Sequence, residues 1–300
     1  MISIAMATYN GAAYIREQID SVLNQTLQDF EIVICDDCSN DKTLSILRQY
    51  EEKDERIHVY KNSNNVGFLK NFENVIKKCR GEYVALCDQD DIWLPDHLEI
   101  LMNAITPSVQ IVCGKPIFVD ENLNKLPEYY DYFLMYAPPF DNMSTARHIF
   151  MGKSTYQGAS MLIRASFFNH ALPIPEGANY HDNWFAILAC FLDGFVFVNK
   201  PTMLYRRYCR SVTFQDRRVS AIRRFLAMII HNQIPEDRKV FIKCLRERLD
   251  QIDPVQKSFL NEIEKKIRLE ESLVGRILNI PYKINHFKAI YACDLKHLFS

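Results

Sequence analysis

The sequence predicts an α/β protein with a mostly parallel β-sheet flanked by helices, followed by a C-terminal helical subdomain. In the first third, short apolar runs rich in β-branched residues alternate with amphipathic stretches of roughly 10–15 residues, which is typical of βαβ units. Several of these apolar runs end in polar residues. From Arg217 onward the apolar spacing is helical, with breaks near Pro235, Pro254 and Pro281.

The first hundred residues supply the predicted parallel strands and their crossover helices. We expect strands over residues 1–6, 30–35, 57–60 and 83–87, because these runs are short and apolar. Helices are expected over residues 14–23, 41–50 and 68–79, where the apolar positions recur with helical spacing. Asp41 is expected to cap the second helix, and Pro95 to open a fourth.

The middle of the chain is less regular. We expect strands over residues 111–113, 117–119, 161–163 and 195–198, and a mostly buried helix over 182–192. A change of pattern near residues 213–216 divides the chain into a main domain, 1–215, and a helical subdomain, 216–300. The main domain divides again into residues 1–106 and 107–215.

Composition describes an ordinary globular protein. Of the 300 residues, 48% are hydrophobic and 24% are charged, which excludes a disordered or fibrous chain. No apolar run reaches the roughly 18 residues of a membrane-spanning helix, and no signal peptide is recognised at the start, so we expect a cytoplasmic protein. An odd number of cysteines, nine, indicates free thiols; Cys35 and Cys38 have a C-x-x-C spacing but lack a second pair of ligands for zinc.

Charge is unevenly distributed along the chain. Residues 200–300 contain 21 Lys and Arg against 11 Asp and Glu, whereas residues 1–199 contain 15 against 26. The C-terminal basic helices are either a solvated surface or a peripheral contact with the anionic inner face of the cell membrane. Nucleic-acid binding is not expected, because no recognised module accompanies the positive charge.

Three carboxylates follow the fourth predicted strand, in Asp88-Gln89-Asp90-Asp91. Like charges so close together disfavour their own ionisation unless a cation lies among them, and Mn²⁺ or Mg²⁺ takes such oxygen ligands together with substrate phosphates. The alternative interpretation is a solvated acidic turn that caps the helix opening at Pro95. On the residues alone, both interpretations stay open.

Two further polar clusters follow strands, Thr8-Tyr9-Asn10 and Asp36-Asp37. The carboxyl ends of parallel strands meet at one edge of a sheet, where ligands bind in open α/β folds. A carboxylate such as Asp37 accepts the imide N–H of a uracil or thymine base, and the face of Tyr9 stacks on such a base. The sequence therefore predicts a ligand site at this edge.

Five segments occur in the same order as in a known family: Ala7-Thr8-Tyr9-Asn10-Gly11, Gln25-Thr26, Asp36-Asp37-Cys38-Ser39, Asn65-Val66-Gly67 and Asp88-Gln89-Asp90-Asp91-Ile92-Trp93. This pattern resembles family 2 glycosyltransferases of the GT-A (Rossmann-like) fold, most closely the bacterial rhamnosyltransferase-like members that build surface polysaccharide. The resemblance is strong over residues 1–100, patchy to about 213 and absent beyond.

The resemblance implies that residues 1–106 bind a nucleoside-diphosphate sugar and residues 107–215 bind the acceptor. Its implied donor-binding residues are Thr8, Tyr9, Asn10, Asp37, Lys70 and Asp88, with Asp90 and Asp88 as ligands of Mn²⁺ or Mg²⁺. The implied activity is transfer from dTDP-rhamnose or a UDP-hexose to a hydroxyl of a bacterial cell-surface glycan or lipid-linked oligosaccharide.

The resemblance also implies an inverting mechanism with Asp182 as general base. A carboxylate at a helix start has its anionic form favoured by the helix dipole, although the same residue also suits an ordinary N-cap. Gly158, His181 and Trp184 are implied contacts on the acceptor side, and Arg206 and Arg210 are implied contacts of the pyrophosphate. Tyr208 stands where many relatives carry a histidine.

Two other functions remain open at this point. A sugar-phosphate nucleotidyltransferase also combines a sheet with an acidic metal site, but Asn10-Gly11-Ala12-Ala13 is a poor phosphate loop. An inactive relative that only binds glycan or membrane is the other alternative.

Overall fold

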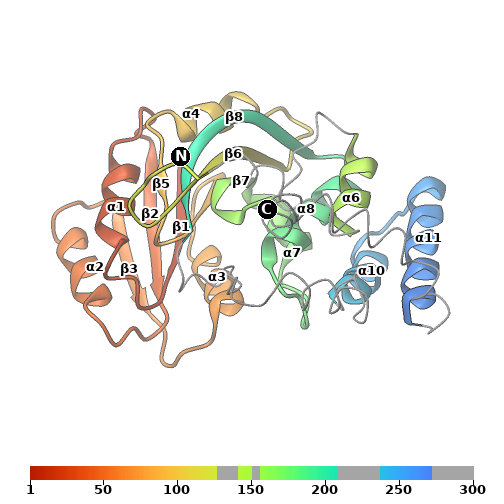
Figure 1. Cartoon of the computed structure of the whole chain (residues 1–300), viewed down its shortest axis with the longest axis horizontal. Helices are drawn as coiled ribbons and strands as arrows, with labels where there is room; N and C mark the ends of the chain where they lie inside the picture. Colours follow the sequence, from red (N-terminus) through yellow and green to blue (C-terminus); the bar gives the residue numbers. More distant parts are fainter. Residues whose placement is uncertain (127–140, 151–155, 208–236, 272–300) are drawn as a thin grey trace, which may run out of the picture.

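The computed structural model describes residues 1–126, 141–150, 156–207 and 237–271. One eight-stranded sheet runs through it in the order β3-β2-β1-β4-β7-β6-β8-β5 (Figure 1). The strands are β1 (Ile2–Thr8), β2 (Phe30–Asp36), β3 (Ile57–Lys61), β4 (Tyr83–Cys87), β5 (Ile92–Trp93), β6 (Ile111–Val119), β7 (Met161–Arg164) and β8 (Phe195–Arg206). The predicted α/β fold with a mostly parallel sheet is confirmed.

The four strands nearest the N-terminus are all parallel and close to their predicted bounds. β1 pairs with β2 on one side and with β4 on the other, and β3 pairs with β2. Nearly every residue of β1 and β2 is buried, as is typical of parallel strands covered on both faces. The carboxyl ends of β1, β2 and β4 therefore lie together at one edge.

The other half of the sheet differs from the sequence-based expectation. The two strands predicted over residues 111–113 and 117–119 are one strand, β6, whose pairing with β8 shifts register on both sides of Lys115. β8 is longer than predicted, and the short strand β5 pairs antiparallel with its end. β7 lies antiparallel between β4 and β6.

Helices cover both faces of the sheet. They are α1 (Ile15–Leu23), α2 (Thr43–Glu51), α3 (Phe68–Ile76), α4 (His97–Asn103), α6 (Asn142–Phe150), α7 (Phe168–Ala171), α8 (His181–Phe191), α10 (Asp237–Arg248) and α11 (Pro254–Glu271). Because side chains alternate along a strand, Ile32 and Ile34 of β2 face the α1, α2 and α4 layer. Val33 and Cys35 face the core that α3, α6 and α8 share.

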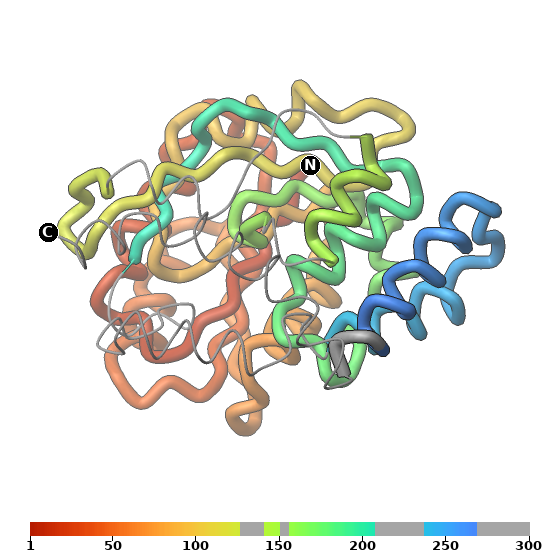
Figure 2. Tube along the Cα trace, turned by 45° about the vertical axis from the view of Figure 1, so that its right-hand side comes forward, coloured from red at the N-terminus to blue at the C-terminus, as the bar shows by residue number. Residues whose placement is uncertain are grey.

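The described part of the C-terminal region shares the core of the main domain. Phe241 and Leu245 of α10 and Phe259 and Leu260 of α11 are buried in the same cluster as α6 and α8. Both helices lie at the end of the molecule opposite α1 and α2 (Figure 1), and Figure 2 shows them beside the green helices. Within the described ranges, no helix is both long enough and apolar enough to span a membrane.

The described cysteines are all free. Burial raises the pKa of the Cys35 thiol to about 11, so this side chain stays protonated and behaves as an apolar core residue. The predicted free thiols are thus confirmed for the described part of the chain.

Candidate active site

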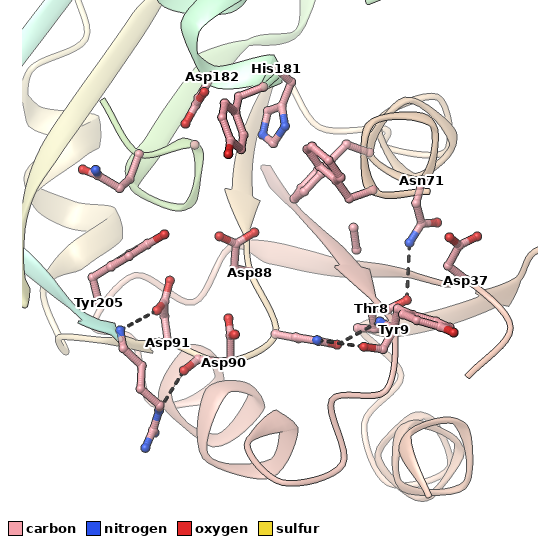
Figure 3. A pocket seen from close by; sticks show the side chains of 18 of the residues that line it. Thr8, Tyr9, Asp37, Asn71, Asp88, Asp90, Asp91, His181, Asp182 and Tyr205 are labelled. Atoms are coloured by element: carbon pink, nitrogen blue, oxygen red, sulfur yellow. Dashed lines mark hydrogen bonds between the residues drawn. The ribbon is translucent and has the colours of Figure 1, made fainter. Parts of the chain in front are cut away.

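A cavity of about 340 Å³ opens at the carboxyl ends of β1, β2 and β4. Its wall brings together the three polar clusters predicted to share this edge of the sheet (Figure 3). The lining residues are Ala7, Thr8, Tyr9, Asp37, Asn65, Phe68, Asn71, Phe72, Asp88, Gln89, Asp90, Asp91, Gln157, Gly158, Tyr180, His181, Asp182, Tyr205 and Arg206.

Tyr9 presents an exposed ring at one end of the cavity, and its backbone is fixed by Gln89. The Gln89 amide donates to the Tyr9 carbonyl at 3.0 Å, and its oxygen accepts from the Tyr9 N–H at 2.9 Å. A Cβ at Gly11 would lie 2.2 Å from the Gln89 oxygen, so any other residue there would displace the Gln89 side chain from Tyr9. The loop after β1 is therefore locked to the acidic loop after β4.

Asp37 is buried beside Tyr9, and its carboxylate organises the loop before α3. It accepts the N–H groups of Val66 and Gly67, both at 2.9 Å, and the Asn62 amide at 2.8 Å. Since Oδ2 has only one of these partners, it retains a lone pair for a ligand. The carboxylate thus has a structural role that its sequence motif does not reveal.

The acidic loop after β4 carries two partly buried carboxyl groups, Asp88 and Asp90. Asp88 lies at the centre of the cavity, between Asp182 on one side and Asp90 on the other (Figure 3). Burial, together with the negative charges of Asp90 and Asp182, raises the pKa of Asp88 to about 7. This concentration of negative charge favours a cationic ligand. No group of three or more His, Cys, Asp or Glu side chains that could hold a metal ion is found among the described residues.

Arg206 and Asp91 hold the acidic loop in place. The buried Arg206 side chain donates from Nε to the Asp90 carbonyl at 2.9 Å and from a terminal nitrogen to the Glu121 carbonyl at 2.7 Å, and it pairs with Glu17. The backbone N–H of Arg206 also donates to the Asp91 carboxylate at 2.9 Å. With its guanidinium engaged by these three partners, Arg206 braces the acidic loop.

Asp182 and His181 open α8 on the wall opposite the acidic loop. Tyr180, and not Asp182, occupies the N-cap position, while the Asp182 carboxylate accepts the Asn183 N–H at 2.7 Å. Burial raises the pKa of Asp182 to about 6, although hydrogen bonds from the Asn183 and Gly158 N–H groups and the charge of Arg238 lower it. A carboxylate with this pKa is suited to accept a proton near neutral pH.

His181 fills the space beside Gly158 and does not face a charged partner. A Cβ at Gly158 would lie 2.6 Å from His181 Nε2, so only glycine fits. The imidazole packs on Phe72 with ring centroids 4.3 Å apart, and neither ring nitrogen has a hydrogen-bond partner in the described part of the chain. Burial lowers the pKa of His181 to about 4, which keeps the ring neutral at physiological pH.

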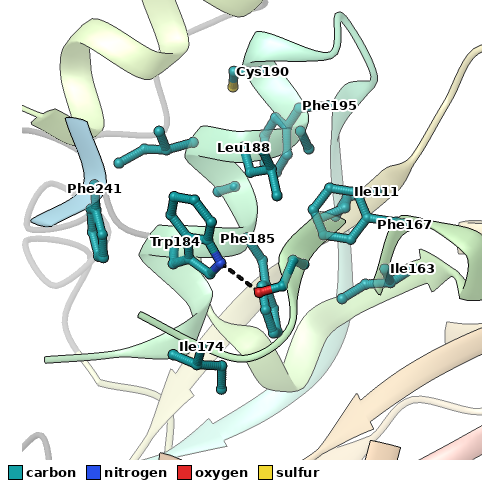
Figure 4. Close-up of a cluster of buried hydrophobic side chains, with 14 of the residues drawn as sticks. Ile111, Ile163, Phe167, Ile174, Trp184, Phe185, Leu188, Cys190, Phe195 and Phe241 are labelled. Atoms are coloured by element: carbon teal, nitrogen blue, oxygen red, sulfur yellow. Dashed lines mark hydrogen bonds between the residues drawn. The ribbon is translucent and has the colours of Figure 1, made fainter. Parts of the chain in front are cut away.

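Three of the residues named from the sequence lie elsewhere. Asn10 accepts from the Asn40 N–H at 2.9 Å and braces the β1 loop from outside the cavity. Lys70 pairs with Glu73 at 2.6 Å and lines a separate groove. Trp184 is buried in the core and donates to the Ala171 carbonyl at 2.9 Å (Figure 4). Arg210 and Tyr208 lie outside the described residues.

Sequence reasoning missed several wall residues. Gln89 stood within the acidic motif, and its position between two aspartates gave no sign of its pairing with Tyr9. Phe68 at the start of α3, Tyr180 just before α8 and Tyr205 in β8 also line the cavity. Only the folded chain brings these aromatic residues together. Phe68 alone carried a sequence signal, because it directly follows the Asn65-Val66-Gly67 motif.

Comparison with solved structures supports the fold. S. aureus TarS in complex with UDP-GlcNAc matches with a TM-score of 0.61 at 20% identity, covering 96% of this chain and 81% of that one. The mannosyltransferase PcManGT of Pyrobaculum calidifontis, in complex with GDP-Man and Mn²⁺, matches with a TM-score of 0.57 at 16% identity, covering 98% of this chain and 75% of that one. At these identities the two likenesses show the fold alone, and they agree with the predicted α/β architecture.

Sequence comparison identifies the family. The putative teichuronic acid biosynthesis glycosyltransferase TuaG of Bacillus subtilis is 41% identical over 99 residues, which cover 33% of this chain and 39% of the relative. The match spans less than half the length of the first curated relatives. The family model for glycosyl transferase family 2 matches residues 3–172, more than half of the sequence. The chain belongs to glycosyl transferase family 2.

Proposed function

We propose that this enzyme transfers a sugar from a nucleoside diphosphate to a hydroxyl of a cell-surface glycan or lipid-linked oligosaccharide, with inversion at the anomeric carbon. One observation carries the proposal. A single cavity gathers an exposed tyrosine with a buried aspartate, a pair of carboxylates and an aspartate at a helix start. These are the groups needed to hold a base, a diphosphate and an acceptor hydroxyl.

The donor nucleotide would lie across the ends of β1 and β2. The Tyr9 ring would stack on the base, and the free lone pair of Asp37 Oδ2 would accept an imide N–H. Uracil and thymine both carry that N–H, so a UDP-hexose or dTDP-rhamnose fits this edge. TarS is described with UDP-GlcNAc, which supports a uridine donor by analogy of fold.

A divalent cation fits the wall formed by Asp88 and Asp90. Both are oxygen donors at the end of one strand, and their crowded negative charge favours a hard cation over an empty site. When bound, Mn²⁺ or Mg²⁺ would stabilise the negative charge of the leaving diphosphate. PcManGT is described with Mn²⁺ and GDP-Man, which agrees with this assignment.

Asp182 would act as the general base from the opposite wall. Its carboxylate would take the proton of the acceptor hydroxyl while that oxygen bonds to the anomeric carbon and the bond from carbon to diphosphate breaks. A single displacement of this kind inverts the configuration. Gly158 and His181 position the start of α8, because the imidazole occupies the space that glycine leaves open.

In this proposal the transfer reaction is a step in the synthesis of a cell-surface polysaccharide. TuaG, named for teichuronic acid biosynthesis, supports this assignment. In this proposal residues 1–106 bind the donor, residues 107–215 bind the acceptor, and the basic region 216–300 makes a peripheral contact with the cytoplasmic face of the membrane. Family membership argues against the nucleotidyltransferase alternative.

A thermal-shift screen tests the proposed donor class. UDP-, dTDP- and GDP-sugars, each with Mn²⁺ or with EDTA, should raise the unfolding temperature only for the matching nucleotide, and more strongly with Mn²⁺, because a ligand that binds only the folded state stabilises it. A panel without any shift would favour the inactive relative and contradict the proposal.

A further inference from the structure

Exposed aromatic side chains gather at the active-site cavity. In the part of the chain that the structure describes, the exposed aromatic residues are Tyr9, Phe68 and Tyr180, and all three line this cavity. Isolated exposed apolar side chains are common on protein surfaces, but a group of them around a cavity marks a binding surface. Stacking on the donor base explains the exposure of Tyr9, but the proposed function so far assigns no ligand to Phe68 and Tyr180.

Phe68 and Tyr180 form a pair beside the proposed general base. Their ring centroids lie 6.1 Å apart, with the planes inclined by 40°. Phe68 begins α3, and Tyr180 precedes α8 by one residue, two positions before Asp182. The neutral His181 ring packs between this pair and Phe72, at 6.5 Å from Phe68 and 4.3 Å from Phe72. The two exposed rings therefore rest on a fixed support.

Phe68 also connects the active-site cavity with a second, more open groove. This groove, of about 860 Å³, lies between α3 and α10 and is lined by Phe68 together with Val66, Pro175, Val240 and other residues. Phe68 directly follows Gly67, whose N–H group bonds to Asp37, and its ring contacts Tyr180, two positions before Asp182. The pair therefore extends from the neighbourhood of Asp37 to the start of α8.

The charges that line the groove are balanced. Lys70 pairs with Glu73 at 2.6 Å, and Lys243 pairs with Glu247 at 3.8 Å. An uncompensated basic surface, which a polyanionic acceptor such as a phosphate-rich polymer requires, is not found among these described side chains. An uncharged saccharide suits the groove better.

We propose that Phe68 and Tyr180 form an aromatic platform on which a pyranose ring of an uncharged acceptor saccharide packs. The C–H face of a pyranose is apolar and stacks on aromatic rings through dispersion contacts. A ring held there carries its hydroxyls next to Asp182. The proposal rests on the proposed function, since it assigns the acceptor of that same reaction.

Saturation-transfer NMR tests the platform with methyl glycosides of glucose, galactose, N-acetylglucosamine and rhamnose, in the presence of UDP, dTDP or GDP with Mn²⁺. At least one glycoside should receive saturation on its ring C–H protons from the wild type. Phe68→Ala and Tyr180→Ala should weaken its affinity by about tenfold, whereas Phe68→Tyr should retain it. Val255→Ala, an exposed apolar site on α11, serves as the control and should change nothing.

Nucleotide affinity is measured on every variant by titration calorimetry, and it should stay at the wild-type value. The platform is overturned if both alanine variants bind the glycoside normally, if they lose nucleotide and glycoside together, or if the wild type binds nucleotide but none of the glycosides. Glycoside binding through these rings without any nucleotide binding would support the platform and refute the proposed function.

Discussion

Replacing Asp182 with asparagine is expected to lower kcat by about 10²–10⁴-fold while donor affinity stays unchanged, because a positioned general base contributes that much to the rate. Asparagine keeps the size of the side chain and an oxygen for the Asn183 N–H, which Asp182 accepts at 2.7 Å. It has no carboxylate to take the proton. Initial-rate kinetics and donor titration on the same preparation measure the two quantities.

The pH dependence separates this role from a structural one. Burial raises the pKa of Asp182 to about 6, so the ionised form needed for catalysis is lost as the pH falls through that value. The wild-type kcat should therefore decline on the acid side near pH 6, and this decline should be absent from the residual activity of Asp182→Asn. Undiminished turnover in that variant would refute the assignment.

Asp193→Asn is a matched control for Asp182→Asn. Asp193 lies beyond the other end of α8, with a positive φ of 52° that asparagine tolerates well. Its carboxylate accepts from the Asn142 amide and does not line the cavity. This variant should transfer sugar at the wild-type rate.

Replacing Asp90 with asparagine is expected to remove the dependence on Mn²⁺. A metal ion contributes several kcal/mol of charge stabilisation, so activity should fall by about 10²-fold or more. Donor affinity measured with Mn²⁺ should fall to the value that the wild type shows in EDTA. Calorimetric titration of the donor with and without Mn²⁺ checks both expectations.

Asp96→Asn controls for the loss of one negative charge near the acidic loop. Asp96 is partly exposed, pairs with Lys200 at 3.2 Å and lies outside the cavity. Its variant should keep the full Mn²⁺ response. If Asp90→Asn retained that response as well, Asp90 would not be a metal ligand.

Local pattern predicted the first half of the fold well, because each strand of a parallel sheet is a short, fully buried run. β2 and β4 lie within one residue of their predicted bounds. The second half depends on long-range pairing. β6 was predicted as two strands because its middle, around Lys115 and Pro116, interrupts the apolar pattern where the pairing shifts register. β5 has only two residues, which no periodicity reveals.

The site was predictable where motifs follow parallel strands, since the topology alone brings Tyr9, Asp37 and Asp88 to one edge. It was less predictable where a side chain has two possible environments. From its position two residues after Asp182, Trp184 was predicted to face the cavity. Successive side chains of a helix point in different directions, however, and Trp184 of α8 points into the core. The sequence suggests that Arg206 contacts an anion, but in the structure its guanidinium bonds to the Asp90 carbonyl, the Glu121 carbonyl and the Glu17 carboxylate.

The residues that complete the wall come from elements far apart in the chain. The side-chain amide of Gln89 fixes the Tyr9 backbone through a pair of hydrogen bonds that only the folded loops create. Phe68 and Tyr180 meet because α3 and α8 begin side by side. No spacing within the sequence contains that information.

The most direct test of the account is calorimetric titration of a nucleoside-diphosphate sugar, chosen by the thermal-shift screen, into the wild type and into Tyr9→Ala. We expect one site per chain in the wild type and stronger binding with Mn²⁺ than with EDTA. In Tyr9→Ala the affinity should be lowered by about tenfold, because stacking on the base is lost. Binding of equal strength in the two proteins, or no binding of any nucleoside-diphosphate sugar to the wild type, would contradict it.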